Sequence, residues 1–245
     1  MHNHHQIQHH LVFSDLASAS VNDLVELVGQ EVHHAVRVKR VKENHTVGVL
    51  DAAGTTATAT VHSIAGSRSK PTLTLKITAL DHHKPILPAI EVFAALPKGD
   101  RLDRMIDQLS QLGVTKFRPL ICQRSQRKPE TVRVDKLERI ALEAAKQCQR
   151  PWVLNLDEPI TFADAIKDPD AIIADASGEQ AVQYPSPARV VLLIGPEGGW
   201  SDEERDQIIA TKMPVMRFGL FVLRIEAAAC AASAIVLSSV SKPTP

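Results

Sequence analysis

Two short stretches near the end of the chain combine glycines and charged residues in patterns that could do chemistry. In the first, residues 192–204 (LLIGPEGGWSDEE), an apolar run ends in a proline, an acid and three glycines: Gly195, Gly198 and Gly199. A glycine without a Cβ lets a ligand or another backbone come close to the chain. The stretch therefore predicts a binding loop built mainly from backbone.

The ligand of this loop is not predicted to be a polyphosphate. A strand that ends in glycines before a helix often binds phosphate, but the GxxxxGK[ST] and GxGxxG patterns are absent. Ser201 and Glu204 have the spacing of a capping box, and the acids at 202–204 would repel phosphates at the start of that helix. S-adenosylmethionine fits better, because its adenine needs backbone hydrogen bonds and apolar walls, and its sulfonium tolerates nearby acids.

The second stretch, residues 218–232 (FGLFVLRIEAAACAA), places two charges in an apolar passage. Gly219 suggests a loop after a strand, and Arg224 and Glu226 follow it. An unpaired buried charge is costly, so these two residues need partners or a function. A plain Arg224–Glu226 ion pair at a helix start is the structural alternative.

The elements around both stretches predict an α/β domain. From residue 90 onward strand-like and helix-like segments alternate, and runs such as residues 190–194 (VVLLI) lack polar alternation. Such runs suit a parallel sheet that is covered on both faces. We expect this domain to span residues 90–245.

The first part of the chain has a different pattern. Residues 1–80 contain short, turn-punctuated β runs and one expected helix over residues 21–29 (VNDLVELVG). Residues 81–89, with two prolines, read as a linker. The sequence thus predicts a small β-rich domain, a linker and a larger α/β domain.

Charge is distributed unevenly although the net charge is zero. Residues 98–150 carry 13 Lys and Arg against 7 Asp and Glu, whereas residues 151–245 carry 7 against 13. Local field decides attraction to phosphates, so a basic face that contacts nucleic-acid phosphates is one interpretation, and ordinary solvated helix faces are the other.

Other sequence features favour a cytoplasmic protein without a metal centre. No run approaches the about 18 apolar residues of a membrane span, and the N-terminus lacks the layout of a secretory signal. Cys122, Cys148 and Cys230 are odd in number and widely spaced, against a disulfide framework or a CxxC site. The irregularly spaced N-terminal histidines predict no specific metal site; they are His2, His4, His5, His9 and His10.

Taken in order, several stretches resemble the SPOUT class of RNA methyltransferases, and within it the RsmE-type family. Residues 33–51 (HHAVRVKRVKENHTVGVLD) resemble the PUA-like RNA-binding domain of that family. The other matching stretches are LPKGDRLDRMIDQLSQLGVTKFRPLICQRS, EAAKQCQRP, LLIGPEGGWSDEE and LRIEAA. The chain departs from the family pattern at Ala227, where a Thr is usual, and in FGLFVLR, where the family loop reads Leu-Gly-x-Arg-Ile-Leu-Arg.

The resemblance implies a fold and an activity. The fold is a C-terminal SPOUT-type parallel-sheet domain with a trefoil knot, preceded by a small N-terminal PUA-like β-barrel. The activity is S-adenosylmethionine-dependent methylation of N3 of a uridine in small-subunit (16S) ribosomal RNA, expected in an assembled particle. The resemblance also implies a homodimer in which two subunits share each active site.

The resemblance and the residues together give a candidate site. Arg224 is the candidate for stabilising the uracil anion, and Glu197 or Glu226 would accept the N3 proton or hold Arg224; sequence leaves these roles open. The residues expected to bind the cofactor are Asp175, Ile194, Gly195, Glu197, Gly198, Gly199, Leu220, Leu223 and Ile225. The residues expected to contact RNA phosphates are Arg37, Lys39, Arg40, Lys98, Arg101, Arg124 and Arg150.

Two alternative functions stay open on sequence alone. One is a SPOUT methyltransferase that acts on another RNA or another atom. The other is a non-catalytic RNA-binding assembly factor with a degenerate cofactor site. The intact GPEGG segment and the presence of Arg224 and Glu226 favour catalysis.

Overall fold

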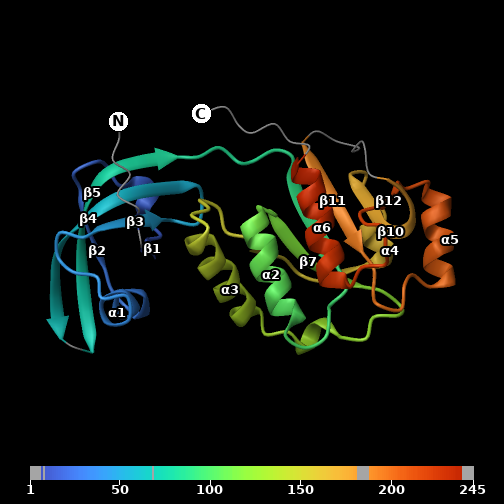
Figure 1. The fold of residues 1–245 in the computed structure, drawn as a ribbon, viewed down its shortest axis with the longest axis horizontal. Coiled ribbons are helices and arrows are strands. Elements are labelled where there is room, and N and C mark those ends of the chain that lie inside the picture. Colours follow the sequence, from blue (N-terminus) through green and yellow to red (C-terminus); the bar gives the residue numbers. More distant parts are fainter. Residues whose placement is uncertain (1–6, 8, 68, 181–187, 239–245) are drawn as a thin grey trace. The chain divides into compact units, whose positions relative to one another are not determined.

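The computed structural model describes residues 7, 9–67, 69–180 and 188–238 and divides the chain into two compact units (Figure 1). Unit 1 comprises Met1–Pro85 and Ala145–Val153, and unit 2 comprises Ile86–Ala144 and Leu154–Pro245. The domain limits that we expect from the sequence, 1–80 and 90–245 with a linker between, remain a proposal.

Unit 1 contains a mixed five-stranded sheet in the order β1-β3-β4-β5-β2. β1 runs parallel to β3, and the other pairings are antiparallel. Side chains such as Val61 and Leu75, which alternate along the long hairpin of β4 and β5, are fully buried. The elements of unit 1 are β1 (His10–Val12), η1 (Leu16–Ser18), β2 (Leu24–Leu27), α1 (Gln30–Arg37), β3 (Thr46–Leu50), β4 (Thr55–Ser67) and β5 (Lys70–His82).

The helix that we expect over residues 21–29 is wrong. This segment holds β2, which pairs with β5, and the helix α1 begins only after Gly29. Val25 and Leu27 are buried while Leu24 and Glu26 are exposed, which is the two-residue period of a strand. Gly29 has φ of 91°, so it ends the strand in a backbone conformation that a helix cannot contain.

The segment Ala145–Val153 belongs to unit 1 although it follows unit 2 residues in the chain. The amide of Val153 donates to the carbonyl of Ala52 at 3.0 Å, and the amide of Gly54 donates to that of Pro151 at 3.0 Å. Lys146 is buried and pairs with Glu31 at 2.8 Å. No pattern in the sequence indicated this return.

Of the N-terminal histidines, His2, His4 and His5 lie outside the described residues. The ring of His10 occupies the space that a side chain at Gly48 would need. Burial, with nearby Lys39, lowers the pKa of His10 below its ordinary value. His10 is therefore a half-buried residue of unit 1 whose neutral form is favoured.

Unit 2 is an α/β unit with a seven-stranded sheet in the order β12-β10-β11-β6-β7-β8, with β9 also paired to β7. All these pairings are parallel. Its elements are β6 (Ala89–Ala94), α2 (Arg101–Leu112), β7 (Lys116–Ile121), η2 (Pro129–Thr131), α3 (Val134–Gln147, whose last residues belong to unit 1), β8 (Asn155–Leu156), β9 (Ile160–Thr161), α4 (Phe162–Ala165), β10 (Ala171–Gln180), β11 (Arg189–Ile194), α5 (Asp202–Thr211), β12 (Val215–Arg217) and α6 (Ile225–Ser238).

Both faces of this sheet are covered, as the uninterrupted apolar run of β11 predicts. Val191 and Leu193 face a core that includes Phe162 of α4 and Ile208 of α5. The alternate residues of β11 are equally buried, and α6 packs against β6 and β11 beside α2 (Figure 1). The strands are thereby held rigidly, and the loops at their carboxyl ends share one edge.

Two absences hold within the described part of the chain. No helix there combines the length and the apolar character needed to cross a bilayer. No group of three or more His, Cys, Asp or Glu side chains there is arranged to hold a metal ion.

Candidate functional site

A cavity of about 280 Å³ opens at the carboxyl edge of the unit 2 sheet. Three segments and the first turn of α6 form it. Its lining residues are Ala174, Asp175 and Ala176 of β10, residues 194–197, 199 and 200 around the loop after β11, Arg205 of α5, residues 217–219 and 221–223 around the loop after β12, and Ile225 and Ala228 of α6. This edge is where ligands bind in open parallel sheets.

The loop after β11 (residues 195–200) ends in a buried tryptophan, Trp200, whose ring packs against Gly195. A Cβ on Gly195 would lie 2.9 Å from the ring of Trp200, which is closer than packed side chains allow. Trp200 is 2% exposed and packs on Phe162 with ring centroids 5.0 Å apart. Gly199 has φ of 68°, a conformation that favours glycine. The glycines therefore bring backbone to the cavity wall.

Arg124 and a helix cap also hold this loop. Arg124 Nη1 donates to the carbonyls of Gly198 at 3.3 Å and Trp200 at 3.0 Å. The capping box between Ser201 and Glu204 that the sequence predicts is confirmed at the start of α5. The second Glu204 oxygen accepts from the amide of Gln123 at 2.9 Å, so the Glu204 carboxylate is fully engaged.

The loop after β12 (residues 219–224) is anchored at both ends and exposed between them. Phe218 and Ile225 are 8% and 4% exposed. Leu223 folds back onto Gly219, where a Cβ would lie 3.2 Å from its Cδ1. Leu220, Phe221 and Val222 are 82%, 80% and 86% exposed.

One cation joins the two loops. Arg101 of α2 pairs with Glu197 at 2.8 Å and lies 3.9 Å from Oε1 of Glu226. Glu226 stands in the first turn of α6, and its Oε2 is buried without a hydrogen-bond partner in the described part of the chain. The two acids are thus assembled around Arg101 rather than around Arg224. The Arg224–Glu226 pair that was the structural alternative is not formed among the described residues.

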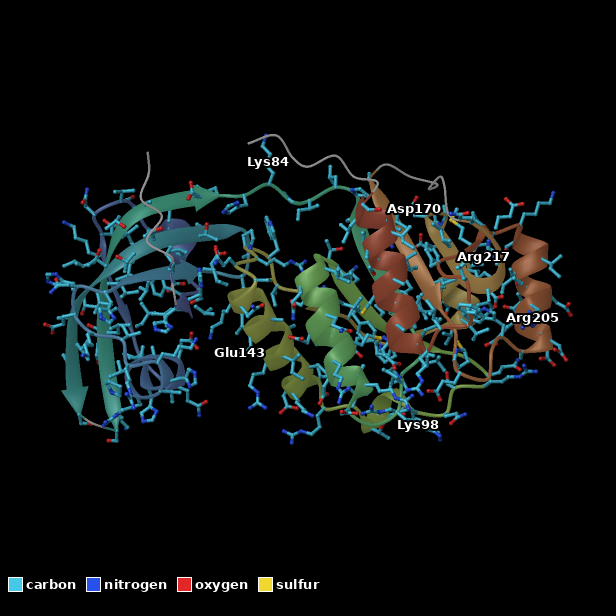
Figure 2. All side chains as sticks on the ribbon, viewed as in Figure 1. Lys84, Lys98, Glu143, Asp170, Arg205 and Arg217 are labelled. Carbon is cyan, nitrogen blue, oxygen red and sulfur yellow. The ribbon has the colours of Figure 1, made fainter. Side chains whose placement is uncertain are left out.

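Three further arginines stand at the cavity. Arg205 and Arg217 line it (Figure 2), and exposed Arg224 precedes α6. Among the described residues none of the three has a carboxylate within ion-pair distance. Asp175, the acid at the opposite wall, accepts hydrogen bonds from the amide and hydroxyl of Ser177 at 2.9 and 2.7 Å. The cavity therefore offers free positive charge beside apolar walls.

The cysteines near the site are not thiolates. Burial, with a further contribution from Glu204, raises the pKa of Cys122 to about 12. Burial and the charge of Glu226 raise the pKa of Cys230 to about 11. Because the thiolate is the reactive form, neither Cys122 nor Cys230 is suited to act as a nucleophile at neutral pH.

Most residues that the sequence singles out for the cofactor lie at the cavity. Those in its lining are Asp175, Ile194, Gly195, Glu197, Gly199, Leu223 and Ile225. Leu220 points to solvent, and a Cβ on Gly198 would face Arg124 instead. These placements leave the assigned roles as predictions.

The residues proposed to contact RNA fall in different settings. Arg37, Lys39 and Arg40 lie at or after the end of α1 in unit 1, and Lys98 is exposed in unit 2. Arg101 and Arg124 are committed to the contacts described above. Arg150 is 7% exposed in unit 1, and burial lowers its pKa to about 10. Little of the Arg150 side chain is therefore available to a phosphate.

Sequence reasoning missed several lining residues, above all Arg205, Arg217, Trp200 and Phe221. Arg217 is the last residue of a strand that precedes a glycine loop, so the rule that parallel sheets bind ligands at carboxyl ends could have found it. Arg205 reaches the cavity from the second turn of α5, which no local signal indicates.

Comparison with known proteins agrees with this geometry. Residues 84–237 match the model of an RNA methyltransferase domain, and residues 27–70 match that of an RNA methyltransferase PUA domain. The chain is 30% identical over 211 residues to a ribosomal RNA small subunit methyltransferase E of Synechocystis, spanning 82% of this chain and 68% of that protein. The Bacillus subtilis protein of the same name is 26% identical over 220 residues, 82% of this chain and 85% of its own.

Solved structures share the fold. The crystal structure of a ribosomal RNA small subunit methyltransferase E from Neisseria gonorrhoeae, bound to S-adenosyl methionine, superposes with a TM-score of 0.80 at 24% identity. The match covers 94% of this chain and 97% of that one. A methyltransferase structure from Legionella pneumophila gives 0.77 at 23% identity, covering 94% and 96%.

Proposed function

The chain belongs to the RNA methyltransferase family of the small-subunit methyltransferase E proteins, and from this premise we propose that it methylates N3 of a uridine in small-subunit (16S) ribosomal RNA, with S-adenosylmethionine as donor. The observation that carries the proposal is the cavity at the carboxyl edge of the unit 2 sheet, which joins backbone-lined walls to unpaired arginines. The choice of N3 follows the RsmE-type resemblance of the sequence.

The residues at the cavity fit S-adenosylmethionine. Gly195 and Gly199 expose backbone for adenine, and Ile194, Leu223 and Ile225 supply apolar walls. Arg205 and Arg217 are suited to a carboxylate, because neither pairs with an acid in the part of the chain that the structure describes. When bound, the cofactor supplies an electrophilic methyl group on a cationic sulfonium.

Methylation of N3 requires that the uracil lose its imide proton while negative charge develops on the ring. Arg224 is exposed beside the cavity, and its guanidinium stays charged and can present a planar fork to a carbonyl edge. Glu197 and Glu226 remain the two candidate proton acceptors. Glu197 lines the cavity, whereas Oε2 of Glu226 is buried without a hydrogen-bond partner among the described residues.

Arg101 acts in this scheme as a positioning residue. Its pairs with Glu197 and Glu226 tie the loop after β11 to the start of α6. Glu197 thereby holds Arg101, and Arg101 lies 3.9 Å from one oxygen of Glu226, whose other oxygen is buried without a hydrogen-bond partner among the described residues. This division assigns to Arg101 a different role from the phosphate contact expected from sequence.

Unit 1 would hold the RNA. Its Arg37, Lys39 and Arg40 are the candidates for phosphate contacts, in a segment that overlaps the matched PUA domain. We further propose a homodimer with composite active sites, a trefoil knot formed by the C-terminal loops, and action in the cytoplasm on an assembled particle. Light scattering should give twice the 26.8 kDa chain mass if the chain is dimeric.

The proposal is tested by nucleoside mass spectrometry of small-subunit RNA after incubation with the protein and S-adenosylmethionine. We expect one new N3-methyluridine. The Arg224→Ala variant should bind cofactor and RNA but slow the chemical step by about a hundredfold or more. Arg104→Ala, which removes an exposed cation of α2, is the matched control and should methylate normally.

Other outcomes would overturn the proposal in distinct ways. Methylation of another atom or another RNA would place the chain with a different methyltransferase specificity. Absence of cofactor binding in calorimetry, together with retained RNA binding, would instead indicate a non-catalytic assembly factor.

A further inference from the structure

We propose that the ring of Phe221 stacks on an unpaired base of the RNA substrate at the mouth of the cofactor cavity and positions that base for reaction. This inference rests on the proposed function and adds to it a residue that determines substrate placement. The loop after β12 supplies the evidence through its shape, its exposure and the charges around it.

The loop after β12 is anchored at both ends, and its tip is exposed. Phe218 and Ile225 bury its two ends, and Leu223 packs back onto Gly219. The tip, Leu220, Phe221 and Val222, is thereby held outward with each side chain at least 80% exposed. Three adjacent large apolar residues that are this exposed on an anchored loop indicate a surface that a partner covers.

Phe221 differs from its neighbour Leu220 in one respect. Both are about equally exposed, but only Phe221 lines the cavity. A base that reacts with a methyl donor held in this cavity would therefore lie within reach of the Phe221 ring.

The charges around the loop favour a nucleic acid over another apolar protein surface. Arg205 and Arg217, both labelled in Figure 2, line the same cavity, and Arg224 ends the loop. None of the three has an ion-pair partner among the described residues. The acids of the cavity, Asp175 and Glu197, are engaged by Ser177 and Arg101. Free cations around an exposed aromatic ring suit the phosphates that flank an unstacked base.

Stacking makes a prediction that general apolar contact does not. A short oligouridylate is the probe, compared with a strand of equal length in which the uracils are replaced by abasic sites. Phe221→Ala should weaken oligouridylate binding by roughly fivefold to a hundredfold, the range for losing one stacked base, and should leave binding of the abasic strand unchanged. Phe221→Trp should restore binding, because its ring also stacks, whereas Phe221→Leu should not.

The matched control is Ile209→Ala, which removes an exposed apolar side chain of α5, in the same unit, that does not line the cavity. It should retain oligouridylate affinity and the KM for small-subunit RNA, while Phe221→Ala raises that KM. Cofactor affinity in calorimetry should be retained in both variants, which also reports that they fold.

Three results would overturn the stacking role. One is equal affinity of Phe221→Leu and the wild-type protein for oligouridylate. Another is equal loss in Phe221→Ala for the uracil and abasic strands. The third is a change of mass in light scattering for Phe221→Ala, which would make the loop a subunit interface. Failure of the wild-type protein to bind cofactor would refute the proposed function separately, because the oligouridylate comparison needs no methyl donor.

Discussion

The two edges of the parallel sheet in unit 2 differ in whether their charged side chains are paired. At the amino edge, Arg189 at the start of β11 donates two hydrogen bonds to Glu91 at 3.0 Å and further bonds to Asp168 at 2.8 and 2.9 Å. Asp170 lies 3.3 Å from the same guanidinium, and Lys116 lies 3.6 Å from Glu91. Every charge in this network faces an opposite one.

At the carboxyl edge, Arg205, Arg217 and Arg224 have no such partner among the described residues, and one oxygen of Glu226 is buried without a donor. Unpaired groups of this kind cost stability, and a fold retains them where a ligand completes them. The amino edge therefore holds the sheet together, and the carboxyl edge is left incomplete for substrate and cofactor. Substitutions at the two edges should separate stability from activity.

The largest expected effect is at the carboxyl edge. Gly195→Val places a branched side chain where even a Cβ would meet the Trp200 ring at 2.9 Å, so the loop or the ring must move. Because inserting extra methyl groups into a well-packed site costs about 1–3 kcal/mol, we expect cofactor affinity to fall by about tenfold to a hundredfold in calorimetry.

The control for this change is Gly198→Ala. Its Cβ would meet Arg124 at 3.4 Å, an ordinary contact, so affinity should change little. If Gly195→Val does not fold because its side chain displaces the buried Trp200, a second pair of variants replaces it. Gly195→Ala alone should lose cofactor affinity, and adding Trp200→Phe should restore it, because the smaller ring leaves room for the Cβ. Wild-type affinity in folded Gly195→Val would show that this backbone does not line the cofactor site.

The second effect is on stability at the amino edge. Arg189→Met leaves Glu91, which is 7% exposed, and Asp168 without their main partner. Breaking a buried pair costs about 3–5 kcal/mol, and since Arg189 is 31% exposed we expect about 2 kcal/mol in denaturant unfolding. Cofactor affinity of the folded protein should stay at the wild-type value.

The same network predicts a pH dependence. Burial is the largest single influence on the pKa of Asp168 and would raise it, but the hydrogen bonds from Arg189 and from the amide of Asp170, with the charges of Arg189 and Lys116, together lower that pKa. A group with a lowered folded pKa contributes stability above its unfolded pKa of about 4, and this contribution is lost as the pH falls through the folded value. The stability difference between wild type and Arg189→Met should therefore shrink below pH of about 4. A difference that grows on acidification would contradict this assignment.

The third effect is smaller and concerns rate alone. Arg101→Met frees Glu197 and Glu226 from the cation that joins them, so we expect kcat to fall by about tenfold while KM for RNA changes little. Arg101→Lys should recover part of the rate through the Glu197 pair. A raised KM, a flatter salt dependence of RNA binding and a normal kcat would instead make Arg101 a phosphate contact.

Much of this organisation could be predicted from the sequence, because it depends on local patterns. Local interactions explain the apolar run of β11, the capping box at Ser201 and the glycine loop at 195–199, because each depends on residues that are close together in the sequence. The strand β2 was misread because VNDLVELVG has apolar residues that satisfy both periods, and only pairing with β5 decides between them.

The rest of the site depends on contacts between distant residues. Arg101 and Glu197 are 96 positions apart, and Arg124 and Gly198 are 74 apart, so no spacing rule brings them together. The basic charge of residues 98–150 suggested phosphate contacts for Arg101, Arg124 and Arg150 alike. In the folded chain, Arg101 and Arg124 are engaged by other protein groups and Arg150 is buried. These contacts and this burial cannot be recognised from the sequence.

The smallest expected effect is the loss of an exposed ion pair with good geometry. Arg133 and Asp135 lie 2.7 Å apart, as close as Arg189 and Asp168, but their side chains are 76% and 68% exposed. The hydrogen bond from Arg133 lowers the pKa of Asp135, yet water screens both charges and replaces that hydrogen bond when the pair opens. We therefore expect Arg133→Gln to leave the Tm and its pH dependence unchanged in calorimetric scans. If Arg133→Gln destabilised the protein as much as Arg189→Met, then burial would not be what distinguishes the amino-edge network, and the contrast between the two edges would need another cause.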